Sequence, residues 1–176
     1  MSTSRLLLAG ICALALTGAA YAIESPNLGK VATPEEIASW DISADPNGDG
    51  LPPGSGTPKQ GEAVYAEKCV ACHGAKGAGK PADRLVGGQG TIAGTKRAIK
   101  TIGSFWPYAT SIYAYVRRAM PYNESKTLTN DELYAVTAYL LNLNGIVGDD
   151  AVMNAKTLPQ VRMPNRDNFI PFKRGD

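Results

Sequence analysis

Histidine is almost absent from this chain of 176 residues, which contains one, His73. A single imidazole excludes metal centres built from several histidines. Cysteine is nearly as rare, with three residues, and charge of one sign is also lacking. The 18 basic and 16 acidic side chains leave a net charge of +2, without the run of Lys and Arg that follows nucleic-acid phosphates. The composition therefore argues against a nucleic-acid-binding protein.

Long hydrophobic runs are also missing, except for one at residues 6–16. Arg5 precedes that run, and the small-residue sequence Ala20-Tyr21-Ala22 follows it, which is typical of a secretory signal with an Ala-x-Ala cleavage site. The run is shorter than the about 20 apolar residues that a spanning helix needs, although an uncleaved anchor is the alternative. We predict a signal peptide at residues 1–22, and a mature protein in the periplasm with no membrane span.

Removal of the signal peptide leaves two cysteines, Cys69 and Cys72, in a C-x-x-C-H sequence that ends at His73. This sequence is the signature of c-type haem attachment. Residues three apart share a helix face, so both sulfurs can reach the vinyl groups along one porphyrin edge, and the histidine can ligate the iron. A disulfide here would staple almost nothing, and a zinc site needs four ligands. The spacing predicts one covalently attached haem c.

The methionines are the remaining candidates for the second axial ligand. Met120 follows a predicted helix at 111–118, and the next residue is a proline, which ends that helix and favours an extended loop. Met153 and Met163 lie in a proline-containing tail without helical periodicity. We predict ligation by His73 and Met120, which fills both axial positions and raises the reduction potential. The alternative is an iron open to ligands, as in a peroxidase or gas sensor.

Three main helices are predicted around the haem. The first covers about 58–69 and contains Gly61, and because a helical Gly costs about 1 kcal/mol relative to Ala, its presence indicates a close helix crossing. The last begins with a capping box formed by Thr129 and Glu132 and ends at Asn144-Gly145. The third is the helix that leads to the distal methionine.

Less regular segments connect and flank these helices. The Gly-rich stretch 74–103 is predicted to wrap the proximal haem edge, with Pro81 as our candidate for the carbonyl that orients the ring of His73. Residues 23–57 form an N-terminal arm with one short helix at 34–40. Residues 148–176 form an extended tail, either disordered or wrapped on the core or on a partner. The cytochrome domain is placed at 58–147.

The arm also contains Asp45, Asn47 and Asp49, followed by Gly50, which imitate the start of a calcium-binding loop. The position that needs a bidentate Glu is occupied by Gly56. We therefore interpret the segment as a surface turn.

Taken together, these motifs resemble the class I c-type cytochromes. The resemblance rests on Gly61, Tyr65, the C-x-x-C-H sequence, Met120 before its proline, and Tyr139 in the closing helix, and it covers about 59–147. It implies an all-α fold of three main helices around one buried haem, with irregular arms. It also implies that the first and last helices cross near Gly61 and Tyr139, and that Cys69, Cys72, His73 and Met120 bind the cofactor.

A narrower resemblance includes segments at 40–42, 50–52, 54–56, 107–109 and 118–121, and is to the haem subunits of periplasmic sulfite and sulfane dehydrogenases. In that group the cytochrome works with a molybdenum sulfite-oxidase-like partner. Sulfane dehydrogenase subunits of the larger type carry two haems, whereas this chain has one C-x-x-C-H sequence, which favours a single-haem acceptor of electrons from sulfite.

The function that these resemblances imply is electron transfer rather than catalysis. The chain would accept single electrons from the molybdenum enzyme and pass them to a further cytochrome or oxidase. The alternative within the same class is a cytochrome that serves another periplasmic dehydrogenase or an oxidase.

Overall fold

The computed structural model describes residues 28–92 and 97–170, so the predicted signal peptide lies outside the described residues. The chain divides into two compact units, Met1–Ile37 and Ala38–Asp176. The described part of the first unit holds most of helix α2 (Pro34–Trp40), which begins where the sequence predicts the short helix of the arm. All other regular elements belong to the second unit.

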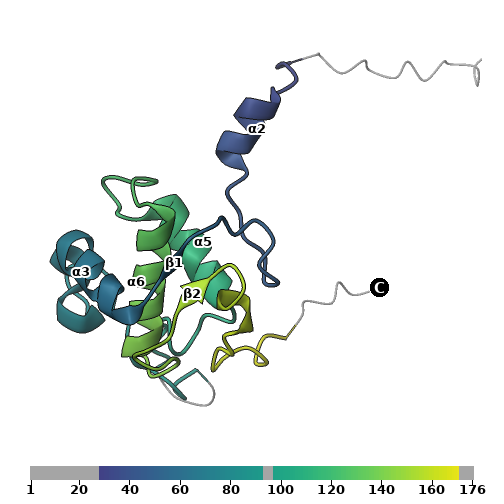
Figure 1. The fold of residues 1–176 in the computed structure, drawn as a ribbon. Helices are drawn as coiled ribbons and strands as arrows, with labels where there is room; N and C mark the ends of the chain where they lie inside the picture. The colour runs from purple at the N-terminus through teal and green to yellow at the C-terminus, as the bar shows by residue number, and fades with distance from the viewer. Residues whose placement is uncertain (1–27, 93–96, 171–176) are drawn as a thin grey trace, which may run out of the picture. The chain divides into compact units, whose positions relative to one another are not determined.

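The second unit is mainly helical (Figure 1). Its elements, in chain order, are β1 (Ser55–Gly56), α3 (Pro58–Lys68), α4 (Val70–His73), the 3-10 turn η1 (Ala75–Gly77), α5 (Ala109–Ala119), α6 (Asn130–Leu143), β2 (Met153–Asn154) and the 3-10 turn η2 (Leu158–Gln160). The three longest helices, α3, α5 and α6, are the three main helices expected from the sequence. In the described part of the chain, no helix combines the length and the apolar composition that crossing a bilayer requires.

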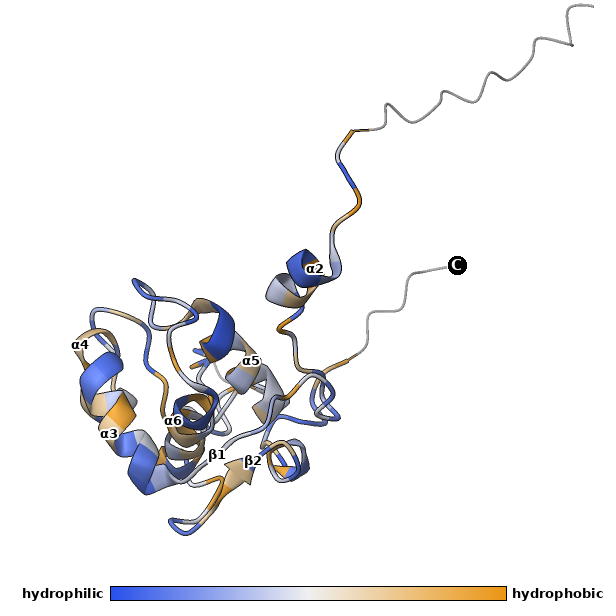
Figure 2. Ribbon diagram, turned by 45° about the horizontal axis from the view of Figure 1, so that its top comes forward, coloured by the Kyte–Doolittle hydropathy of each residue, from blue (hydrophilic) through white to orange (hydrophobic). Residues whose placement is uncertain are grey.

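Helix α6 is the centre of this unit and packs against both α3 and α5 (Figure 2). It begins at the predicted capping box, in which the Thr129 hydroxyl accepts a hydrogen bond from the Glu132 N–H and the Glu132 carboxylate accepts one from the Thr129 N–H. It ends at Leu143 with Asn144 as its C-cap, and Gly145 has a φ of +69°, as the predicted left-handed cap requires. Nine of its residues are buried, so α6 supplies much of the hydrophobic core.

Gly61 is the point of closest approach between α3 and α6. A Cβ built on Gly61 would lie 1.9 Å from the backbone oxygen of Ala135 and 2.8 Å from the Cβ of Tyr139. The rings of Tyr65 and Tyr139 pack beside the crossing, with centroids 5.4 Å apart. The crossing near Gly61 and Tyr139 is therefore confirmed, and its cause is the missing side chain.

The segment after α6 is wrapped on the core as far as Phe169, so for this part of the tail the structure shows the ordered alternative left by the sequence. β2 pairs antiparallel with β1, so that Ser55 lies opposite Asn154 and Gly56 opposite Met153 (Figure 1). Further along, the ring of Phe169 packs edge-on against Phe105. Both flanks of the helical domain thus share one small sheet.

Candidate functional site

The two cysteines and the histidine form a single helical turn. Cys69 ends α3 and caps α4, and its carbonyl accepts hydrogen bonds from the backbone N–H groups of Cys72 and His73, at 3.2 and 2.9 Å. Both thiols are free, Cys72 is exposed and Cys69 is partly buried. Burial raises the pKa of the Cys69 thiol to about 11, with a smaller contribution from Cys72, so this sulfur is an uncharged thiol at neutral pH. The two cysteines thus lie three residues apart on one helical turn.

The ring of His73 is oriented by a backbone carbonyl, as predicted, but the carbonyl belongs to Asp83 and not to Pro81. The His73 Nδ1 lies 2.8 Å from the Asp83 oxygen. A carbonyl can only accept, so Nδ1 carries the proton and Nε2 has its lone pair free to ligate a metal. The prediction of Pro81 was wrong because the chain turns at Lys80 and Ala82, whose backbones bond to each other, and this turn brings the carbonyl two residues later onto the ring.

Backbone hydrogen bonds fix this turn to the helix that carries the cysteines. The N–H of Gly79 donates to the His73 oxygen at 2.7 Å, and the N–H of Ala82 donates to the Cys72 oxygen at 2.9 Å. The hydroxyl of the buried Tyr65 donates to the Gly74 oxygen at 2.8 Å. These hydrogen bonds, which we call the proximal clamp, connect the C-x-x-C-H turn to residues that precede it and to residues that follow it.

Asn144 connects the proximal clamp to α6. The sequence predicted this residue only as part of the end of the last helix. Its amide nitrogen donates to the Leu85 and Leu140 oxygens, at 3.2 and 2.8 Å, and its amide oxygen accepts from the Gly87 N–H at 3.0 Å. Leu85 follows Asp83 by two residues, so this buried side chain holds the loop that orients the histidine. A polar residue at the buried end of an apolar helix is the only signal that the sequence offers for it.

Met120 lies where the sequence places it, at the C-terminal cap of α5. Its N–H donates to the Val116 oxygen at 3.0 Å, its backbone is extended, and its side chain is partly buried against the core. Met153 and Met163 are 5% and 1% exposed and are members of the hydrophobic core cluster. Met120 is thus the methionine of the described chain that ends a helix and is not enclosed in the core.

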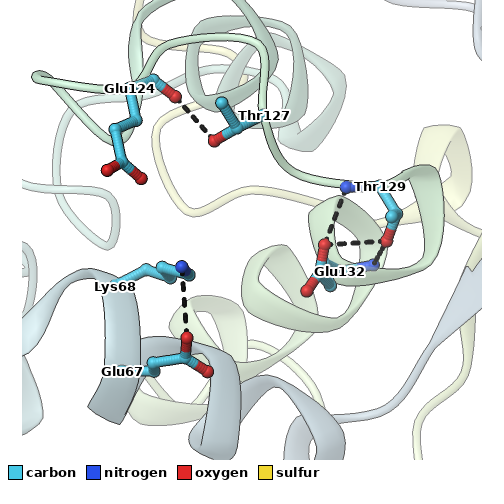
Figure 3. A network of polar contacts seen from close by, with 6 residues as sticks. All are labelled: Glu67, Lys68, Glu124, Thr127, Thr129 and Glu132. Atoms are coloured by element: carbon cyan, nitrogen blue, oxygen red, sulfur yellow. Dashed lines mark hydrogen bonds and ion pairs between the residues drawn. The ribbon is translucent and has the colours of Figure 1, made fainter.

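The loop after Met120 comes close to the end of α3 that carries Cys69. Figure 3 shows Glu124 and Thr127 of this loop, the capping box of α6, and Glu67 with Lys68 at the end of α3. The pKa of Lys68 is raised mainly by the carboxylate of Glu67, 3.1 Å away, and further by Glu124 and Glu132. The surface beside Cys69 is therefore an ion cluster with more acidic than basic groups.

The calcium-like segment is a turn. The carboxylate of Asp45 accepts hydrogen bonds from the N–H groups of Asn47, Gly48 and Asp49, at 2.8 to 2.9 Å. Within the described ranges, no group of three or more His, Cys, Asp or Glu side chains is placed to hold a metal ion. The interpretation as a surface turn holds.

The residues present fit a covalently attached haem. Two free thiols lie three residues apart on one short helix, and the imidazole that follows has its Nδ1–H engaged and Nε2 free. This donor set is the one that attaches haem c and ligates its iron on the proximal side. A partly buried thioether is present at the end of α5.

Comparison with known proteins agrees with this chemistry. The family model described as cytochrome c matches residues 58–144. A chain in the crystal structure of the sulfane dehydrogenase SoxCD from Paracoccus pantotrophus is 44% identical, with a TM-score of 0.77, and the alignment covers 85% of this chain and 74% of that one. None of the curated proteins compared with the chain matches it.

Proposed function

The chain belongs to the cytochrome c family, and on that premise we propose that it is a periplasmic electron carrier with one haem c. In this proposal it accepts single electrons from a molybdenum-containing sulfite dehydrogenase and passes them to a further cytochrome or oxidase. The observation that carries the proposal is the C-x-x-C-H turn, in which the Asp83 carbonyl leaves Nε2 of His73 free for iron.

Each site residue has one task. The sulfurs of Cys69 and Cys72 would hold the cofactor covalently, which prevents its loss outside the cell. His73 would ligate the iron from the proximal side, and the Met120 thioether would ligate it from the other. Haem c, when bound, supplies the one-electron chemistry of its iron. With both axial positions filled by protein side chains, His73 and Met120 would leave no position on the iron for a substrate.

The position of the methionines supports a carrier over an open-iron enzyme. Met153 and Met163 are enclosed in the core, whereas Met120 is presented at the end of α5. Its backbone N–H donates to the Val116 oxygen, so the backbone from which its side chain extends has a defined position.

The electron donor is proposed from the likeness to a sulfur dehydrogenase. Identity of 44% over most of the chain supports a partner that oxidises a sulfur compound. The single C-x-x-C-H sequence favours sulfite as the compound. Because oxidation of sulfite releases two electrons, the chain must accept an electron twice for each sulfite consumed.

A second candidate function is favoured by the same comparison. The matched structure is named a sulfane dehydrogenase, so a sulfane-oxidising enzyme is the alternative donor. The two candidates differ only in the enzyme that reduces the chain.

The test is to mix oxidised, haem-loaded chain with the molybdenum enzyme of the same organism and to follow the absorption of reduced haem. Sulfite should produce reduction, at two chains per sulfite, and omission of either sulfite or the enzyme should abolish it. Reduction by a sulfane substrate and not by sulfite would support the second candidate. Reduction only by an unrelated dehydrogenase would contradict both.

A further inference from the structure

The segment 28–40 exposes an unusual number of apolar side chains. Leu28, Val31, Ile37 and Trp40 are between 54% and 94% exposed, and every residue of α2 is exposed. Ile37 and Trp40 lie three residues apart and therefore share one face of α2. Large apolar groups gathered on one short segment indicate a surface that another protein covers.

Helix α2 is defined by its own sequence. The Thr33 hydroxyl accepts a hydrogen bond from the Glu36 N–H at 3.2 Å, and the Glu36 carboxylate accepts one from the Thr33 N–H at 2.9 Å. Pro34 occupies the first helical position, and Lys30 forms an ion pair with Glu36. A seven-residue helix is marginal without tertiary packing, even with such a cap. The capping box therefore supports a short helix whose apolar side chains, Ile37 and Trp40, remain exposed.

The last residue of α2 and the residues that follow it contact the helix end and the loop on either side of Met120. The guanidinium of Arg118 donates to the Ser43 hydroxyl at 2.9 Å, and that of Arg117 donates to the Ile42 oxygen at 3.4 Å. The Lys126 ammonium lies 4.9 Å from the centre of the Trp40 ring. These contacts come from the end of α5 and from the loop after Met120, so residues 40–43 of the second unit lie close to the residue that we predict as the distal ligand.

We propose that segment 28–40 is a docking arm that binds the dehydrogenase of the proposed function, and this inference rests on that function. The likeness to the sulfane dehydrogenase chain covers 85% of 176 residues, about 150, so it cannot be confined to the 87 residues of 58–144. The flanks are thus part of what the two chains share. An arm anchored beside Met120 would also keep the donor near the proposed haem.

The composition of the arm disfavours a lipid surface as the occupant. Residues 28–40 contain one Lys and two Glu, a net charge of −1, whereas helices that lie on anionic membranes are rich in Lys and Arg. A second copy of this chain is the other occupant to be tested.

The experiment uses the haem-loaded full chain and the molybdenum sulfite dehydrogenase, with the dissociation constant measured by calorimetry. Ile37→Asp should weaken binding at least about tenfold, and addition of Trp40→Ala should weaken it further, as expected for anchors in a desolvated interface. The matched control is Ile170→Asp, which changes an isoleucine that is 93% exposed on the tail and should leave the constant within about twofold. In the complex with the unaltered chain, the backbone amides of 28–40 should become protected from hydrogen exchange.

Four outcomes would overturn the inference. If Ile37→Asp binds as tightly as the unaltered chain and is reduced by sulfite at the same rate, the arm is not the docking element, although the proposed function stands. If the unaltered chain neither binds the enzyme nor is reduced, both fail. If Ile37→Asp instead dissociates a dimer that the unaltered chain forms alone in sedimentation, the occupant is a second copy. If it abolishes binding of the chain to anionic phospholipid vesicles, the occupant is a membrane.

Discussion

The two sides of the candidate haem site are built differently. On the proximal side, Tyr65, Asp83 and Asn144 connect the C-x-x-C-H turn to α3, to the following loop and to α6 through hydrogen bonds of 2.8 to 3.2 Å. On the distal side, Met120 is held by one backbone hydrogen bond and by apolar packing. Among the described residues, the proximal half of the candidate site is thus held by several hydrogen bonds, and the residue predicted for the distal half by one.

This difference indicates where each half derives its function. A ligand fixed through its second ring nitrogen has a defined orientation before the metal is present. If Met120 ligates the iron, as we propose, its flexible thioether would take its final position through the bond to the metal. We therefore expect changes on the proximal side to affect folding, and changes on the distal side to affect the metal more than the fold.

The largest effect is expected at Gly61, where α3 and α6 cross. In Gly61→Ala, the new Cβ would meet the Ala135 oxygen at 1.9 Å, and since this is backbone, α3 and α6 must separate. The free energy of unfolding, from denaturant titration, should fall by about 3 kcal/mol or more. Gly148→Ala is the matched control because nothing lies within 4 Å of its Cβ, and equal stability of the two variants would contradict the close crossing.

The next largest effect is expected for a change that affects the proximal half alone. Asn144→Ala removes three hydrogen bonds and leaves the Leu85 oxygen and the Gly87 N–H without their partner side chain, so the free energy of unfolding should fall by about 2–3 kcal/mol. Asn142→Ala is the control on the same helix, because its amide bonds to the Val147 oxygen and to the exposed Asp149. It should cost about 1 kcal/mol. A larger loss of stability for Asn142→Ala than for Asn144→Ala would show that the hydrogen bonds of Asn144 do not hold the proximal loop in place.

Met120→Ala addresses the distal half. Loss of a partly buried methionine should lower the free energy of unfolding by about 2 kcal/mol. Its main result should be spectroscopic: the weak red absorption of the iron–thioether bond disappears, and the reduced protein binds carbon monoxide. Met163→Leu, a volume-conserving change in the core, should alter neither property. Ready binding of carbon monoxide by the unaltered protein would make the ligation by Met120 wrong and favour an open iron.

The smallest effect at neutral pH is expected for Tyr113→Phe in α5. Among the described residues, the Tyr113 hydroxyl is buried without a hydrogen-bond partner, and its removal should change the free energy of unfolding by less than about 1 kcal/mol. Burial, and then the neighbouring Tyr134, raise the pKa of Tyr113 above its ordinary value of about 10.

That shift gives the variant a pH signature. The neutral phenol stabilises the folded state fully below pH 10, and this stability is lost as the pH rises from there toward the folded-state pKa, by about 1.4 kcal/mol per pH unit. Thermal melts between pH 7 and 11 should therefore fall less steeply for Tyr113→Phe than for the unaltered protein. Tyr122→Phe, at an exposed position, should follow the unaltered protein. Parallel curves for all three proteins would mean that Tyr113 ionises freely.

Local chemistry explains what the sequence predicted well. The capping box at Thr129 and the left-handed residue Gly145 each depend on residues whose conformational needs are decided within one turn. The C-x-x-C-H turn is of the same kind. These features were accessible because a few adjacent residues determine them.

Long-range contacts explain what the sequence did not predict. The carbonyl that orients His73 depends on how the loop from Gly79 to Asp83 folds back, which no local pattern specifies. The role of Asn144 depends on a loop 57 to 59 residues earlier in the chain. The fixed position of the tail depends on pairing between β1 and β2, each only two residues long, too short for a strand pattern to be read.

The small sheet formed by β1 and β2 limits how far the chain can be shortened. Cutting at 58 and 144, where the family likeness begins and ends, would discard both strands and the tail side chains that fill the core, including the fully buried Leu158. Because the shortened polypeptide would expose apolar core surface to water, we expect it to aggregate before its cofactor could be attached. The working minimum for expression therefore begins upstream of Ser55 and continues past Met163.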